Sequence, residues 1–243
     1  MPEGPSILLI REALQSFTGK KILVVKGNSK IDQSRLLNQE IRAIKSWGKH
    51  LLICFDKFTL RIHFLMFGTY LINEQKSTPL RLSLIFKKGE VNFYTCSIRI
   101  LEEPPEKIYD FSADTLNASW SPRKAGLKLS KIKDRMVCDA LLDQEIFAGV
   151  GNIIKNEVLF RIRVHPESIV GKLPPRKKSE LIKEARNYSL DFLKWKRAFV
   201  LKKHYLIYTK KICPRDKCLV TREWVGKTNR RTFFCEKCQV LYR

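Results

Sequence analysis

The spacing of apolar and polar residues divides the chain into a short N-terminal helix, a strand-rich stretch and a helical stretch. After Pro5, apolar residues recur at intervals of three and four, which predicts an amphipathic helix over residues 5–17. From about 20 to 103 the period falls to two, and Lys88-Gly89 is a predicted hairpin turn. Several short strands with glycine-containing turns are typical of a sandwich or barrel.

Helical spacing returns near residue 130, after Pro104 and Pro105 close the strand-rich stretch. Residues 131–143 are predicted to form one helix, ending near Asp143. The sequence therefore predicts an α+β protein in which a sandwich domain is followed by a helical domain.

Charge adds a first indication of function. The chain has 47 Lys and Arg against 24 Asp and Glu, a net charge of +23, with an ordinary globular hydrophobic content of 44%. This composition excludes a disordered chain and favours a polyanionic partner, nucleic acid above all. Residues 172–211 hold 13 cations and 3 acids, although such a run also fits a solvated helix face.

Two further observations concern the compartment. The chain lacks the roughly 18 to 20 consecutive apolar residues of a membrane span. Its start carries Glu3 and Glu12 where a signal peptide needs an apolar run, so we expect a cytoplasmic protein that does not enter membranes.

Four cysteines gather near the C-terminus: Cys213, Cys218, Cys235 and Cys238. Their pattern, C-x4-C followed by sixteen residues and C-x2-C, predicts one tetrahedral zinc ion with a structural role. Four unrelated buried thiols are the alternative. The other cysteines lie in apolar surroundings and are expected in the core: Cys54, Cys96 and Cys138.

Two short motifs carry candidate chemistry. Gly149 and Gly151 permit a tight turn before a helix that runs from Asn152, as its N-cap, to about residue 160, and such a turn offers N–H groups to a phosphate. A plain corner between helices is the alternative, which the residues alone favour. If Met1 is removed, Pro2 becomes a secondary amine that is partly neutral at pH 7, with Glu3 beside it. An ordinary helix start is the alternative.

Together these motifs resemble the formamidopyrimidine-DNA glycosylase and endonuclease VIII family over essentially the whole chain. They occur in the family's order: MPEGP at 1–5, WGKHLL at 47–52, HFLMFG at 63–68, LLDQ…GVGNI…NE at 141–157, and RRTFFCEKCQ at 230–239. The resemblance implies a monomeric, bacterial-type base-excision-repair enzyme that acts on damaged DNA at the nucleoid, as a glycosylase and an abasic-site lyase, with one structural Zn²⁺.

The resemblance also implies domain bounds and residue roles. The expected domains are a helix and β-sandwich over 1–110, a linker over 111–129, a helix-two-turn-helix domain over 130–205 and a zinc finger over 206–243. The expected catalytic residues are the nucleophile Pro2, the acid/base Glu3, and Lys49. The expected phosphate ligands are His63, Asn152, Tyr208 and Arg230. The residues expected to fill the gap left by a flipped base are Leu65, Met66 and Phe67, although this stretch also fits a buried strand end.

Arg230 is chosen over Arg231 because the family's arginine stands five residues before the third cysteine. Three departures from the family pattern favour the endonuclease VIII branch and oxidised pyrimidines. Ser6 replaces a usual glutamate, TCSIRI at 95–100 lacks an Arg and Phe pair, and 199–210 is short for a lesion-covering loop. The alternatives are an oxidised-purine glycosylase, a catalytically weak binder of damaged DNA, and a zinc-ribbon RNA-binding protein.

Overall fold

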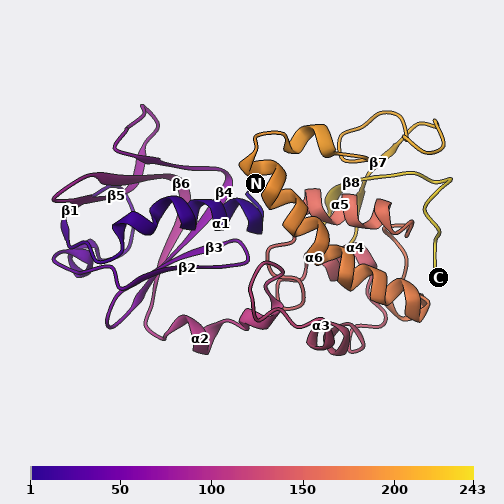
Figure 1. Ribbon diagram of the computed structural model, residues 1–243, viewed down its shortest axis with the longest axis horizontal. Coiled ribbons are helices and arrows are strands. Elements are labelled where there is room, and N and C mark those ends of the chain that lie inside the picture. Colours follow the sequence, from indigo (N-terminus) through magenta and orange to yellow (C-terminus); the bar gives the residue numbers. More distant parts are fainter. Residues whose placement is uncertain (1) are drawn as a thin grey trace. The chain divides into compact units, whose positions relative to one another are not determined.

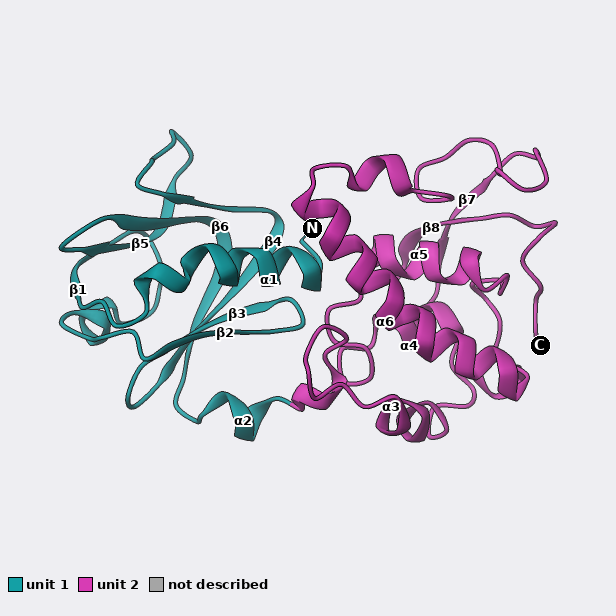
Figure 2. Cartoon of the chain, viewed as in Figure 1, with its two compact units in different colours: residues 1–109 teal, residues 110–243 magenta. Residues whose placement is uncertain are grey.

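The computed structural model describes residues 2–243 and divides the chain into two compact units, residues 1–109 and 110–243 (Figure 2). Each unit has its own cluster of fully buried apolar side chains. Among the described residues, none of the helices is long and apolar enough to cross a membrane.

Unit 1 consists of the N-terminal helix and an antiparallel β-sandwich, as the sequence predicts. The helix α1 (Gly4–Leu14) continues as the short 3₁₀ helix η1 (Gln15–Phe17). The strands are β1 (Ile22–Lys26), β2 (Ala43–Trp47), β3 (His50–Cys54), β4 (Thr59–Ile72), β5 (Leu80–Phe86) and β6 (Glu90–Leu101). The 3₁₀ helix η2 (Gln33–Leu36) follows β1, and α2 (Pro105–Ile108) follows β6.

The strand order β1-β5-β6-β4-β3-β2 makes one hydrogen-bonded sheet that serves as both layers of the sandwich. The long strands β4 and β6 belong to both halves. Residues 59–63 of β4 pair with β3, and residues 69–72 of β4 pair with the part of β6 that also pairs with β5. In Figure 1, β1 and β5 lie apart from β2 and β3. Apolar side chains from α1 and both halves fill the space between them.

Unit 2 is helical and ends in a β-hairpin. Its α-helices are α3 (Pro122–Leu129), α4 (Val137–Leu142), α5 (Asn152–Arg161) and α6 (Pro175–Arg197). Its 3₁₀ helices are η3 (Phe111–Ala113), η4 (Val170–Lys172) and η5 (Leu201–His204). The hairpin strands are β7 (Thr221–Val225) and β8 (Arg230–Phe234). Val225 and Phe234 are buried in the same cluster as the helices, so the hairpin packs onto them.

Two local predictions differ from the structure. Of the helix expected over 131–143, only α4 forms. The N–H groups of Val137 and Cys138 donate to the carbonyls of Ser168 and Pro166, outside the helix, so the helix does not extend further toward the N-terminus. The expected linker 111–129 contains η3 and α3. Ala125 and Leu129 of α3 are buried in the helical core, and an amphipathic helix of this kind gains its stability from such packing.

Candidate functional site

The chain start places Pro2 and Glu3 immediately before α1. Pro2 is half-buried, and Glu3 is only 3% exposed. The Glu3 carbonyl accepts hydrogen bonds from the N–H groups of Ser6 at 2.8 Å and Ile7 at 3.2 Å, which begins the helix. Ser6 is buried in this first turn. Removal of Met1, on which a nucleophilic Pro2 depends, lies outside the described residues.

Lys49 stands at the tip of the β2–β3 hairpin. Trp47 pairs with His50 across the tip, and Gly48 has a φ of 52°. Glycine is preferred where the first central residue of a two-residue turn has a positive φ. Gly48 therefore permits the tight turn that places Lys49 at the tip. The positive charge of Lys49 helps to lower the pKa of His63, after the larger effect of burial, so the two side chains share one electrostatic environment.

Beside Lys49, the outer face of the sheet is strongly cationic. His63 on β4 lies opposite His50 on β3, and their ring centroids are 5.4 Å apart. Burial, followed by the charges of Arg61, His63 and Lys49, lowers the pKa of His50 to about 3. Arg61 shares this face, because it lies two residues from His63 along the strand.

Arg61 faces a second arginine. It pairs directly with Arg99 on β6, and like charges in such cross-strand positions are destabilising. Within the described chain, the buried Nε of Arg61 and the buried Nδ1 of His50 have no hydrogen-bond partner. Sequence reasoning missed His50, Arg61 and Arg99. For Arg61 the sequence held an indication, because the period-two spacing of RIH at 61–63 puts Arg61 and His63 on one face of the strand.

The stretch 65–67 is exposed, not buried. Leu65, Met66 and Phe67 are 44%, 58% and 75% exposed. They lie where the register between β4 and β6 breaks, between Phe64 and Thr69. A Cβ on Gly68 would lie 2.9 Å from the Cα of Phe64 and from the carbonyl oxygen of Thr95, so this close backbone approach requires glycine.

In unit 2, Asn152 begins α5 but is not its cap. The N-cap is Gly151, whose carbonyl accepts from the N–H of Lys155 at 2.9 Å, so the expected capping role of Asn152 is wrong. The Asn152 side chain instead donates from Nδ2 to the carbonyl of Arg231 at 2.8 Å, and its buried Oδ1 has no hydrogen-bond partner among the described residues. This amide therefore joins α5 to the hairpin.

Three further polar residues of α5 hold neighbouring segments. Lys155 is fully buried and donates to Oγ1 of Thr232 at 2.7 Å. Asn156 accepts at Oδ1 from the N–H of Phe233 at 2.8 Å. Glu157 accepts from three successive backbone N–H groups, at residues 206–208. Burial raises the pKa of Glu157, while these N–H donors and Arg161 oppose the shift.

These contacts position Tyr208 and Arg230. Tyr208 donates its N–H to Glu157 at 2.8 Å, and its ring meets that of Phe233 edge-on at 5.2 Å. Arg230 is the first residue of β8 and is exposed. The guanidinium of Arg231 lies over Trp224, whereas the Arg230 side chain has no hydrogen bond or ion pair within the described chain. Arg230 as a phosphate ligand stays a prediction.

A cysteine cluster near the C-terminus could hold a metal ion. The Sγ atoms of Cys213 and Cys238 are 4.0 Å apart, and those of Cys218 and Cys235 are 3.3 Å apart. These distances bracket the roughly 3.8 Å expected between thiolates at tetrahedral corners with metal–sulfur bonds of about 2.3 Å. Sequence reasoning missed Asp216, whose Oδ2 lies 3.5 Å from the Sγ of Cys235.

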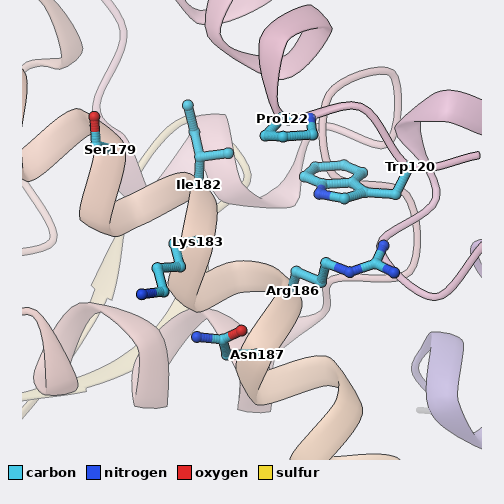
Figure 3. A pocket seen from close by; sticks show the side chains of 7 residues that line it. All are labelled: Trp120, Pro122, Ser179, Ile182, Lys183, Arg186 and Asn187. Carbon is cyan, nitrogen blue, oxygen red and sulfur yellow. The ribbon is translucent and has the colours of Figure 1, made fainter.

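Unit 2 also contains a surface pocket of about 680 Å³ between α6 and the segment before α3 (Figure 3). None of the residues predicted from the sequence to form a site lines it. The lining residues are Trp120, Pro122, Ser179, Ile182, Lys183, Arg186 and Asn187. The Arg186 guanidinium donates to the carbonyls of Thr115 and Asn117, so its main hydrogen bonds support the wall of the pocket.

Two family models match the chain. Residues 1–99 match the formamidopyrimidine-DNA glycosylase N-terminal domain, and residues 113–189 match the formamidopyrimidine-DNA glycosylase H2TH domain. The first match covers most of unit 1, and the second covers unit 2 from the end of η3 into α6.

Curated relatives include endonuclease 8-like 3 of Xenopus laevis, 34% identical over 90% of this chain and 38% of that protein. Endonuclease 8-like 3 of Homo sapiens is 33% identical over 81% of this chain and 34% of that protein. The chain thus spans little more than a third of these relatives. The DNA-(apurinic or apyrimidinic site) lyase Nei2 of Mycolicibacterium smegmatis is 30% identical over 71% of both chains.

Solved structures share the fold. The Lactococcus lactis formamidopyrimidine-DNA glycosylase bound non-covalently to abasic-site DNA has a TM-score of 0.85 at 22% identity, covering 98% of this chain and 99% of that one. A viral DNA glycosylase has a TM-score of 0.84 at 22% identity, covering 98% of this chain and all of that one. With its motifs, both domain matches and the similarity to Nei2, this chain belongs to the formamidopyrimidine-DNA glycosylase and endonuclease VIII family.

Proposed function

We propose that this protein removes oxidised bases from DNA and then cuts the strand at the resulting abasic site. The observation that carries the proposal is the chain start: Pro2, which becomes a terminal amine once Met1 is removed, is followed directly by Glu3, a residue only 3% exposed. An amine nucleophile next to a buried acid/base is the pair that imine chemistry on a sugar requires.

The reaction divides into balanced steps. The lone pair of the Pro2 nitrogen attacks C1′ of the damaged nucleotide, the bond from C1′ to the base breaks, and the base leaves with the proton that the Pro2 nitrogen loses. Opening of the sugar ring, to which Glu3 supplies a proton, gives an iminium ion between Pro2 and C1′. The iminium acidifies the neighbouring C2′ hydrogen, the Glu3 carboxylate takes that proton, and β-elimination expels the 3′ phosphate. A second elimination expels the 5′ phosphate, and water then releases Pro2.

The remaining predicted residues hold the DNA in this proposal. Lys49 and His63 in unit 1 contact phosphates near the reacting sugar. Asn152, Tyr208 and Arg230 in unit 2 contact phosphates through an exposed cation and a polar surface built on α5. The base must leave the helix to react, and the exposed side chains at 65–67 are suited to fill the space that it leaves.

We propose zinc as the metal of the cysteine cluster, held by Cys213, Cys218, Cys235 and Cys238. When bound, the ion cross-links the ends of the hairpin and supplies no group to the reaction. Elemental analysis of protein purified without chelators should return about one zinc per chain. Cys238→Ser should lower the zinc content and weaken DNA binding, while a zinc content near zero in the unchanged protein would refute the assignment.

For the lesion, we propose oxidised pyrimidines ahead of oxidised purines. The short segment 199–210 and the absence of the Arg and Phe pair at 95–100 support this order. A binder of damaged DNA with little activity is the second candidate, because the buried first turn of α1 holds Ser6 where the family usually has a glutamate.

Borohydride trapping separates the two candidates. The protein is incubated with duplexes that each carry one lesion: thymine glycol, 5-hydroxyuracil, dihydrouracil or 8-oxoguanine. An enzyme gives cleaved strands and, with borohydride, a covalent protein–DNA adduct, most rapidly with the pyrimidine lesions. Retardation of the DNA in a gel with neither cleavage nor adduct would overturn the proposed activity in favour of the binder.

A further inference from the structure

An exposed phenylalanine ends α6 in a position that normally belongs to glycine. Phe199 has a φ of 59°. Its N–H donates to the carbonyl of Lys196 at 3.1 Å, and the N–H of Val200 donates to the carbonyl of Trp195 at 2.9 Å. This pair of bonds is the Schellman motif, whose left-handed residue is usually glycine because a Cβ is strained there.

The Phe199 side chain buries almost no surface that could offset this strain. Phe199 is 97% exposed, the highest value among the large exposed apolar residues that the structure describes. Arg163 occupies the matching position after α5, with a φ of 58°, but a charged side chain loses little in water. Phe199 therefore combines a strained backbone with an aromatic ring left in solvent, which indicates a role outside folding.

The charge around Phe199 indicates what the ring meets. Between Asp191 and Asp216 the sequence contains eight Lys or Arg residues and no Asp or Glu. A polyanion is the partner that such a segment attracts. An aromatic ring beside cations is the combination by which proteins hold unpaired nucleotides, with the ring stacked on a base and the cations on the phosphates.

A membrane surface fits less well. Insertion into lipid headgroups needs a continuous apolar face. Besides Phe199, the segment between Asp191 and Cys213 has two large exposed apolar residues, Leu206 at 37% and Ile212 at 49%. Lysines separate Phe199 from both residues.

We propose that Phe199 is a stacking platform for an unpaired nucleobase of the bound DNA strand. The inference rests on the proposed function only in taking DNA as the partner. It adds a base contact in unit 2, at the turn that follows α6 in Figure 1. A fully paired duplex offers no free base face to this ring, so the contact favours DNA with unstacked bases.

The test measures equilibrium binding of Phe199→Gly to two probes at one salt concentration: a single-stranded oligonucleotide and the same sequence fully paired. We expect single-strand affinity to fall about tenfold or more and duplex affinity to change less than twofold. Phe199→Trp should retain single-strand binding. Leu127→Ala, which shortens a 56% exposed side chain on α3, should change neither affinity.

Phe199→Gly also avoids the usual difficulty of a variant that does not fold. Glycine suits the left-handed conformation, so its melting temperature should be unchanged or higher. A lower melting temperature would show that the ring serves folding and would overturn the proposal. Unchanged single-strand affinity, equal losses on both probes, or a Phe199-dependent association with anionic phosphatidylserine vesicles in place of DNA would also overturn it.

The outcome is independent of catalysis, because the readout is binding. Borohydride trapping of the unchanged protein, run in parallel on an abasic duplex, reports the proposed function. Loss of single-strand affinity in Phe199→Gly without any adduct from the unchanged protein would support the platform and reject the enzyme. An adduct together with unchanged single-strand affinity would do the reverse.

Discussion

The outer face of the sheet in unit 1 and the contact between α5 and the hairpin in unit 2 differ in whether their buried polar groups are hydrogen-bonded. Near α5, Lys155, Asn156 and Glu157 are buried, and each bonds to the segment that it supports. On the sheet face, Arg61 stands opposite Arg99, and its buried Nε has no partner within the described residues.

The contrast indicates that one contact supports the fold and that the other surface binds a partner. Satisfied buried polar groups fix one arrangement, so the α5 contact is a rigid support for Tyr208 and Arg230. The like charges of Arg61 and Arg99 repel each other, so an anion from outside the protein would stabilise this face, and a DNA phosphate would supply one. Internal support should therefore show in folding stability, and an open binding face in the salt dependence of DNA binding.

The largest expected effect concerns the internal support. Glu157→Ala leaves the N–H groups of residues 206–208 without their acceptor, which should lower the free energy of unfolding by about 3–5 kcal/mol. Glu157→Gln keeps an oxygen at the position of Oε1 and should lose less than half as much. Chemical denaturation measures both. Equal losses in the two variants would show that these bonds do not support the segment.

A smaller effect follows from the pKa of His50, which is lowered from 6.5 to about 3. The folded protein takes up this proton less readily than the unfolded chain, so the stabilisation is present above pH 6.5 and is lost as the pH falls toward 3. Between pH 7.5 and pH 4, the unchanged protein should lose about 3 kcal/mol more stability than His50→Phe. Parallel pH profiles for the two proteins would contradict the electrostatic description of this face.

The smallest effect on folding is expected at the arginine pair. Arg61→Gln or Arg99→Gln removes a like-charge contact, so stability should stay within about 0.5 kcal/mol or rise. In DNA binding, each change should reduce the slope of log affinity against log salt by about 1. Lys87→Gln, an exposed cation in the β5–β6 turn, is the control. Slopes that match this control would mean that the pair does not contact phosphate.

Much of this architecture is predictable from local patterns. The three-and-four spacing predicts the first helix, and Lys88-Gly89 lies in the turn between β5 and β6. The C-x4-C and C-x2-C pattern predicts a sulfur cluster, which the structure brings together. The helix and the turn are predictable because each depends on residues close in sequence. The cysteine cluster joins residues up to 25 apart and is predictable because metal sites use a regular spacing of cysteines.

The errors and omissions arise where contacts between segments distant in sequence determine the local structure. The amide of Asn152 bonds to Arg231, 79 residues away, so a capping rule based on neighbouring residues assigned it the wrong partner. The apolar run at 65–67 also fits the alternative of a buried strand end, but the break in register against β6 exposes it, so only that alternative is wrong. Arg61 and Arg99 become neighbours only when β4 pairs with β6, which no local period reveals.

The claim on which the account depends most is that the covalent chemistry belongs to Pro2 at the N-terminus of unit 1, while the other predicted residues of both units bind the DNA. The direct measurement is peptide mass spectrometry of the borohydride-trapped adduct formed with an abasic-site duplex. The account predicts that the sugar remnant is attached to the N-terminal peptide at the nitrogen of Pro2, with Met1 absent, and that Pro2→Gly gives little adduct. A sugar remnant on an internal lysine, such as Lys49, would contradict it.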